Sequence, residues 1–170
     1  MRKPIIGVMG PGDDAKENII KTAFLLGQMI AENNWILLNG GRNVGVMNAV
    51  SLGAKTKNGT IIGVVPNSDD NGISEYLDII IRTDMGQARN NINVLSSDIV
   101  ISCGMNPGTA SEIALAMRAG KKILMLEAGA HAESFFKSLD ENNNIIIVSN
   151  PQEAVKKIES LLFDLEGKKD

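Results

Sequence analysis

The sequence predicts an α/β fold, with a single doubly wound and mostly parallel sheet that carries helices on both faces. Three observations support this fold. Short runs rich in Ile and Val alternate along the chain with longer amphipathic stretches. The connections between them are short, which is typical of strand–helix–strand units in a parallel sheet. Several of the strand-like runs end in glycine, a residue that stops regular structure.

In the first half of the chain, strands are predicted where apolar β-formers are continuous and helices where apolar residues recur at helical spacing. The strands cover 5–9, 35–38, 60–65 and 79–81, and the helices cover 15–32 and about 44–57. Asp13 and Asp14 suit the N-cap of the first helix. The longest polar stretch, 67–75, is predicted to be a loop and a candidate lid.

The second half repeats the alternation of strands and helices. Strands are predicted at 99–101, 122–126 and 144–148, and helices at about 86–96, 113–119 and 152–163. No internal repeat or linker interrupts the pattern. We therefore expect one domain over residues 1–165, followed by a polar tail at 166–170.

Composition narrows the class of protein. The chain has 170 residues, of which 44% are apolar and 22% charged, as in ordinary globular proteins. Its net charge of −3 argues against nucleic acid as a partner. A single Cys permits no intramolecular disulfide and fits a reducing compartment. The first apolar run breaks at Gly10, too early for a signal peptide or a membrane span, so we expect a cytoplasmic protein without a membrane partner.

Glycines follow three of the predicted strands. They are Gly10 and Gly12, then Gly40, Gly41 and Gly45, and finally Gly104 and Gly108, the last of these beside Thr109. One glycine loop is weak evidence for a ligand, because glycine also serves ordinary tight turns. In a parallel sheet, however, all three loops lie on the same carboxyl edge, where such folds bind ligands. A pocket for a nucleotide or another phosphorylated ligand is therefore favoured.

Two common phosphate motifs do not account for these loops. The second loop has the spacing Gly-Gly-x-x-x-Gly, and the next strand ends at Pro66 without the carboxylate that binds the ribose of NAD. The Gly-Lys-Ser/Thr sequence of a P-loop is absent as well. An NAD dehydrogenase and a P-loop enzyme are both disfavoured.

The segment 103–112 is the most informative part of the chain, because a buried strand leads through a loop rich in Gly and Thr into a helix. Such a junction presents backbone N–H groups to an anion. Glu112, one turn into the helix, would point at the ligand, and Arg89 on the preceding helix could hold a phosphate. Arg42 and Asn106 are weaker candidates. A surface Arg and a first-turn Glu matched to the helix dipole explain the pattern equally well.

Other reactive side chains carry less weight. Cys103 ends a strand beside the loop, but a buried structural Cys is commoner than a nucleophile, and no His lies near it in sequence. His131, the sole His, is interpreted as a cap or surface residue near the start of a candidate helix. No Cys/His cluster has metal-ligand spacing, so no metal is expected.

Two stretches, 39–50 and 59–66, resemble the glycine-rich half of the LONELY GUY proteins, a superfamily also labelled lysine-decarboxylase-like. Arg89 and the segment 107–112 match the second half of that family. The segments 88–90 and 111–116 are still more similar to its molybdenum-cofactor-carrier-like branch. The resemblance spans roughly residues 5–127.

This resemblance implies a Rossmann-like fold that forms a homo-oligomer, a dimer or a tetramer. In the hydrolase branch, the pocket cleaves the N-glycosidic bond of a nucleoside 5′-monophosphate, with Arg89 and Glu112 catalytic and the loop 104–109 holding the phosphate. In the carrier branch, a similar pocket holds a molybdopterin-type cofactor as cargo, without turnover.

The chain departs from the hydrolase pattern in its phosphate loop. Met105 and Asn106 stand where that branch has small residues, and Asn90 replaces the Lys that usually follows the Arg. These changes favour the carrier, whereas the intact Arg89 and Glu112 keep the phosphoribohydrolase open. A scaffold with a vestigial pocket is a third reading. The sequence leaves the identity of the ligand and the role of 67–75 open.

Overall fold

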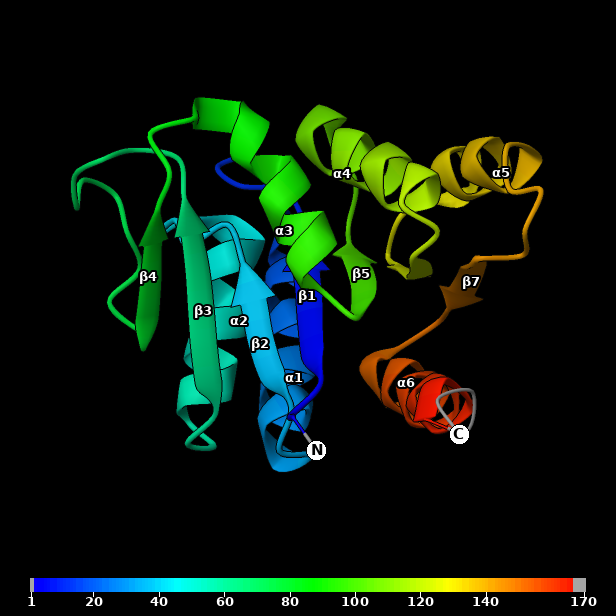
Figure 1. Ribbon diagram of the computed structural model, residues 1–170, viewed down its shortest axis with the longest axis horizontal. Helices are drawn as coiled ribbons and strands as arrows, with labels where there is room; N and C mark the ends of the chain where they lie inside the picture. Colours follow the sequence, from blue (N-terminus) through cyan, green and yellow to red (C-terminus); the bar gives the residue numbers. More distant parts are fainter. Residues whose placement is uncertain (1, 167–170) are drawn as a thin grey trace.

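In the computed structural model, which describes residues 2–166, seven parallel strands form one sheet in the order β4-β3-β2-β1-β5-β6-β7 (Figure 1). The strands are β1 (Ile5–Met9), β2 (Ile36–Asn39), β3 (Thr60–Val65), β4 (Ile79–Arg82), β5 (Ile99–Cys103), β6 (Lys122–Leu126) and β7 (Ile145–Val148). The helices are α1 (Glu17–Glu32), α2 (Gly45–Lys55), α3 (Asn90–Ser96), α4 (Pro107–Arg118), α5 (Ala130–Ser138) and α6 (Pro151–Glu166), with a 3₁₀ turn η1 (Gly86–Arg89) before α3. The predicted fold class is confirmed.

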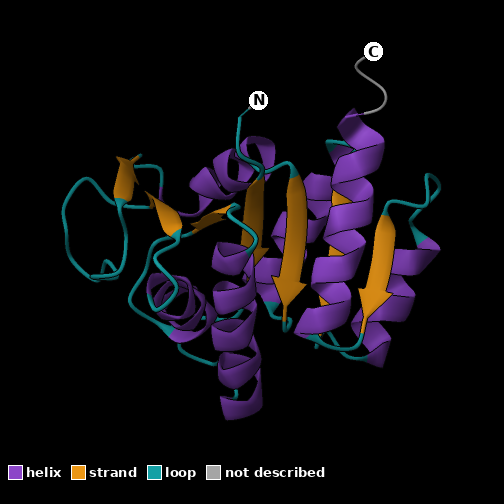
Figure 2. Ribbon diagram, turned by 90° about the horizontal axis from the view of Figure 1, so that it is seen from below, coloured by secondary structure: helices purple, strands orange, loops and turns teal. Residues whose placement is uncertain are grey.

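Helices cover both faces of the sheet, and each face has its own apolar core (Figure 2). On one face, α1, α2 and α6 pack against the strands, and on the other, α3, α4 and α5 do. Strand β5, next to the central strand β1, supplies both cores, because successive side chains of a strand point to opposite faces. Ile99 and Ile101 join the first core, and Val100 joins the second.

The helices α1 and α2 approach each other through glycine. A Cβ atom on Gly27 of α1 would collide with the carbonyl oxygen of Val50, and one on Gly53 of α2 would collide with that of Phe24. The missing side chains therefore let the two backbones come into contact. This contact holds α2 closely against α1 on one face of the sheet.

The strand order reverses beside β1. The chain runs outward from β1 through β2 and β3 to β4, and then returns to place β5 on the other side of β1. Loops that leave neighbouring strands at such a point diverge to opposite faces and open a crevice at the carboxyl edge. The predicted glycine-marked ends of β1, β2 and β5 all lie on this edge.

Local sequence signals placed several element ends incorrectly. Helix α1 begins at Glu17 rather than at residue 15, and its N-cap, Lys16, makes no side-chain cap. Asp13 and Asp14 therefore do not cap this helix, so the N-cap prediction was wrong. Asp13 instead pairs with Arg42, and Asp14 accepts a hydrogen bond from Asn106.

Two predicted helices also differ from those observed. The helix predicted over 86–96 is divided into η1 and α3, so that Arg89 ends a 3₁₀ turn rather than lying within an α-helix. The helix predicted at 113–119 starts earlier, at Pro107, because Asn106 caps it and proline suits a first turn. In the predicted tail, Glu166 is the last residue of α6, and 167–170 lie outside the described residues.

The polar segment 67–75 is attached to the loop after β2. Arg42 and Ile73 form an isolated antiparallel bridge, Asn43 N donates to Gly72 O, and Ser74 N donates to Gly41 O. These bonds tie the backbone position of Arg42 to the segment. Its role as a lid stays a prediction.

Replacing Gly27 by Ala should destabilise the protein by about 1–3 kcal/mol, because the new methyl group forces α1 and α2 apart. Chemical denaturation followed by circular dichroism would measure the change. Gly108→Ala is the matched control, since its added Cβ would meet its nearest neighbour, Asn106 Oδ1, at 3.4 Å. Equal stability of the Gly27 variant and the native chain would contradict the close packing.

Candidate functional site

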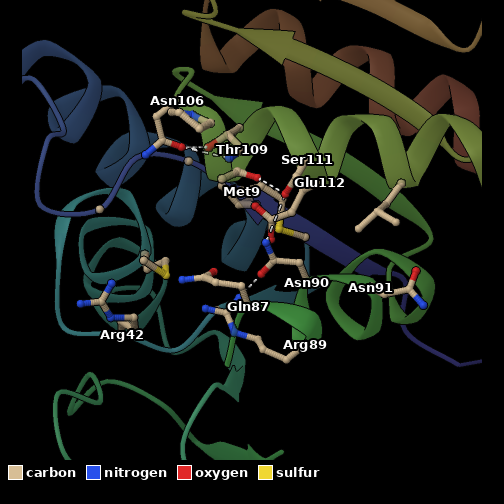
Figure 3. Close-up of a pocket in the computed structure, with 18 of the residues that line it drawn as sticks. Met9, Arg42, Gln87, Arg89, Asn90, Asn91, Asn106, Thr109, Ser111 and Glu112 are labelled. Carbon is tan, nitrogen blue, oxygen red and sulfur yellow. Dashed lines mark hydrogen bonds between the residues drawn. The ribbon is translucent and has the colours of Figure 1, made fainter. Parts of the chain in front are cut away.

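A cavity of about 690 Å³ opens at the carboxyl edge where the strand order reverses, between η1 and α4 (Figure 3). Nine of the residues predicted for the site line it: Gly10, Gly12, Gly40, Arg42, Arg89, Asn106, Gly108, Thr109 and Glu112. They come from four separate parts of the chain, which the parallel sheet brings to one edge. The volume suits a ligand of nucleotide or cofactor size.

Three predicted glycines lie outside this cavity, and each has a backbone role. Gly41 (φ +71°) donates its N–H to Asn39 Oδ1 at 2.7 Å. Gly45 (φ +47°) begins α2, where a Cβ would collide with the carbonyl oxygen of Gly12. Gly104 (φ +81°) donates to Leu126 O at 2.8 Å. These positive φ angles account for the glycines as turn residues.

Arg89 is a buried cation with spare donors. Its side chain is only 5% exposed, and its Nη1 donates to Asn90 Oδ1 at 2.8 Å. Its Nε has no hydrogen-bond partner among the described residues. A Cβ on Gly40 would come within 2.6 Å of Arg89 Nη2, so this glycine makes room for the guanidinium. Burial lowers the pKa of Arg89, the charge of Glu112 opposes this shift, and nearby Arg42 adds to it.

Glu112 is the buried acid of the same cavity. Its Oε1 accepts a hydrogen bond from Asn93 Nδ2 at 3.2 Å, and the residue is 7% exposed. Burial raises the pKa of Glu112 to about 7, although the Asn93 bond and the Arg89 charge both act to lower it. No direct ion pair between Arg89 and Glu112 forms in the described part of the chain. The carboxyl group can therefore gain or lose a proton near neutral pH.

The start of α4 is already capped by the protein. Asn106 Oδ1 accepts from the N–H of Thr109 at 2.9 Å and from its hydroxyl at 3.0 Å, while Asn106 Nδ2 donates to Asp14. Pro107 has no N–H, so Gly108 supplies the remaining free backbone donor of the first turn within the described chain. An anion at this helix end would therefore meet few backbone donors and would depend on side chains.

Arg42 reaches the cavity from the loop after β2. Its guanidinium lies 3.7 Å from the carboxylate of Asp13, whose side chain is largely exposed, whereas that of Arg42 is 41% exposed. Such a pair contributes little to stability and can rearrange when a ligand binds. Figure 3 shows Arg42 and Arg89 on the same side of the cavity, with Glu112 entering from α4 on the other.

Sequence reasoning did not single out several polar residues of the site. Gln87, Asn90, Asn91 and Ser111 line the cavity, and Asn93 supports Glu112 from behind. The four lining residues are all within two positions of Arg89 or Glu112, which was the available signal. Asn93 lies three residues after Asn90, on the same face of α3. The hydrogen bond between Asn93 and Glu112 could not be inferred from the sequence, because it depends on how the fold brings the two helices together.

The remaining candidates lie apart from this chemistry. Cys103 is fully buried, and burial raises its pKa to about 12, so its thiol stays protonated. This is consistent with the interpretation of Cys103 as a structural residue rather than a nucleophile. His131 is exposed in the first turn of α5. Within residues 2–166, no cluster of His, Cys, Asp and Glu could hold a metal ion. No helix in that range has the length and apolar character needed to cross a membrane.

A family model matches residues 3–155, nearly the whole described chain, and its description is the SLOG cluster4 family. The chain belongs to this family. A curated relative, an uncharacterized protein from Archaeoglobus fulgidus, is 41% identical over 147 residues, which are 85% of this chain and 95% of that protein.

Two solved structures are similar over 95% of this chain and 99% of their own. One is the molybdenum cofactor binding protein of Rippkaea orientalis, with 48% identity and a TM-score of 0.93. The other is the molybdenum cofactor carrier protein of Chlamydomonas reinhardtii, with 46% identity and a TM-score of 0.90. The resemblance stated from segments 39–66 and 88–116 is thereby confirmed in superfamily and in branch. The predicted homo-oligomer stays a prediction.

Replacing Glu112 by Gln should change how stability depends on pH. Folding raises the pKa of Glu112 from its ordinary 4.5 to about 7, so the folded protein binds this proton more tightly than the unfolded chain does. This group therefore lowers stability progressively as pH rises from about 4.5 to 7. The isosteric Gln cannot ionise, so the variant should gain up to about 3 kcal/mol relative to the native chain above that range.

Urea denaturation across this pH range would measure the difference in unfolding free energy between the two proteins. Glu159→Gln, an exposed change on α6, is the matched control. A difference that stays constant with pH would show that Glu112 titrates normally.

Proposed function

We propose that this chain binds the molybdenum cofactor, a pterin that carries a phosphate, and holds it as cargo in the cavity at the carboxyl edge of the sheet. The similar protein from Rippkaea orientalis binds the molybdenum cofactor, and the one from Chlamydomonas reinhardtii carries it. Their identities of 48% and 46% to this chain support the proposal. A carrier requires a pocket with room for its ligand. The cavity of about 690 Å³ between η1 and α4 provides such a pocket.

Arg89 is the observation that carries the proposal. A guanidinium that is 5% exposed, with an Nε that lacks a partner among the described residues, is costly unless an anion joins it. A phosphate group supplies both the charge and the acceptor oxygens. The cavity therefore has the character of a phosphate site with its cation already in place.

The phosphate would lie between Arg89 and Arg42, near the start of α4. Gly108 N–H and the positive end of the α4 dipole would add to the attraction. The predicted backbone cradle is reduced here, because Asn106 already occupies the N–H of Thr109. Gly10 and Gly12 would leave space for the ligand at the end of β1, while Gly40 makes room for Arg89.

Binding of the intact cofactor can be tested by mixing the chain with cofactor released from a molybdoenzyme and separating the two by gel filtration. Molybdenum and pterin should elute together with the protein in equal amounts. A protein fraction free of both would overturn the proposal.

Replacing Arg89 by Gln should weaken phosphate binding specifically. Loss of a charge-assisted hydrogen bond corresponds to roughly a tenfold or greater loss of affinity. The stable oxidised pterin derivative of the cofactor, with and without its phosphate, is a suitable fluorescent probe pair. We expect a loss of about tenfold or more for the phosphorylated probe and little change for the other.

Arg118→Gln, an exposed change near the end of α4, is the matched control for removal of one positive charge. Equal losses for both probes would show that Arg89 does not contact the phosphate.

A second candidate is hydrolysis of the N-glycosidic bond of a nucleoside 5′-monophosphate. The observation that favours it is Glu112, whose pKa of about 7 suits a general acid or base at neutral pH, in the same cavity as Arg89. In that reaction Arg89 would hold the phosphate, and Glu112 would stabilise positive charge on the sugar while water attacks.

This candidate predicts release of free base from AMP or an N6-substituted AMP, with ribose 5-phosphate as the other product. Chromatography of the reaction mixture would detect both. Glu112→Gln should abolish the release, while Glu159→Gln should retain it. Absence of turnover by the native chain would exclude these substrates and leave the carrier function.

A further inference from the structure

The proposed cofactor cavity carries charge of both signs, in separate places. Arg89 and Arg42 lie on one side, and Glu112, the single carboxylate among the described lining residues, enters from the other (Figure 3). A site for phosphate alone would gain nothing from a buried acid, which repels an anion. The ligand that fits this arrangement has an acidic group at one end and hydrogen-bond donors at the other.

Glu112 has acceptor capacity left for such donors. Only Oε1 is used, by Asn93 Nδ2 at 3.2 Å, and Oε2 has no partner in the described part of the chain. A carboxylate offers about four lone-pair sites on its two oxygens, so both oxygens can accept further bonds. Asn93 is fully buried, and its amide fixes the direction in which the carboxylate faces.

The walls beside Glu112 suit a flat ring. Met9, at the end of β1, and Leu115, one turn beyond Glu112 on α4, line the same cavity. Met9 is 2% exposed, and its flexible thioether can lie against an aromatic face. An aromatic ring held between such side chains would present its edge to the carboxylate.

We infer that Glu112 recognises the aminopyrimidinone edge of the pterin, accepting one hydrogen bond from the ring N–H and one from the exocyclic amino group. This inference rests on the proposed function. The paired bonds match two adjacent acceptors to two adjacent donors, as carboxylates do with guanidinium groups. The ring is thereby oriented with its phosphate-bearing side toward Arg89 and Arg42.

This pairing makes Glu112 a specificity-determining residue. A lumazine differs from a pterin by a carbonyl in place of the exocyclic amino group, so its oxygen would face the carboxylate without a proton between them. A site built to accept from a donor rejects the analogue that lacks it. A neutral Gln at the same position offers one acceptor and one donor, so it would pair fully with the lumazine edge but with only one of the two pterin donors.

The test compares a pterin phosphate with the matching lumazine phosphate by titration calorimetry at about pH 8, where Glu112 is ionised. We expect the native chain to bind the pterin at least about tenfold more tightly. Glu112→Gln should reduce this ratio to unity or below, by weakening pterin binding and improving lumazine binding. Glu159→Gln, an exposed change on α6, should keep the native ratio.

The outcomes separate this inference from the proposed function. A Glu112→Gln variant that binds the pterin phosphate with unchanged selectivity would overturn the inference and leave the cofactor site standing. Failure of the native chain to bind either compound would overturn both. Equal affinity of the native chain for the two rings would also refute the role given to Glu112.

Discussion

Two opposite charges are buried in one cavity, and the protein keeps them from neutralising each other. Arg89 is held by the amide of Asn90, and Glu112 is held by the amide of Asn93. Both amides belong to the first turn of α3, three residues apart, and therefore face the same way. A direct bridge would satisfy both groups and would leave nothing for a ligand. The short helix thus fixes each charge while it preserves their capacity to bind.

Burying both charges lowers the stability of the fold, and the packing of the sheet offsets this cost. Burial disfavours the charged form of both groups, as the lowered pKa of Arg89 and the raised pKa of Glu112 indicate. Two apolar cores, one on each face of the sheet, offset such local costs. The cavity lies at the carboxyl edge, so the unfavourable groups disturb neither core. Buried charges that cost stability are expected at binding sites, because binding requires them although folding does not.

The sequence was sufficient to predict the fold class and the edge that carries the cavity. Strand and helix periods identify the alternation, and a parallel sheet then requires Gly10, Gly40 and Gly104 to share one edge. Arg89 and Glu112 could be named because their motif neighbours resemble those of a known family. The residues that hold these two side chains in place were harder to predict from the sequence. Asn93 acts on Glu112 across 19 positions of the chain, a contact that only the packing of α3 against α4 creates.

The wrong N-cap prediction has a physical origin, because it concerns a side chain with two equally good local uses. Asp14 could cap α1, but it accepts from Asn106, which in turn caps α4. Glycine at positions 41, 45 and 104 is likewise open to two uses, because the same residue type permits a positive φ angle and the close approach of a ligand. Local sequence does not distinguish these uses, since both need the same residue type.

The position of Cys103 has a consequence for the proposed carrier function, whose cargo would be rich in sulfur. Its neutral, enclosed thiol, the sole thiol of the chain, is a weak nucleophile and a poor metal ligand. The chain therefore has no accessible thiol that could exchange with a cofactor dithiolene or compete for its molybdenum. A labile ligand bound at the carboxyl edge would therefore meet no reactive thiol of the protein.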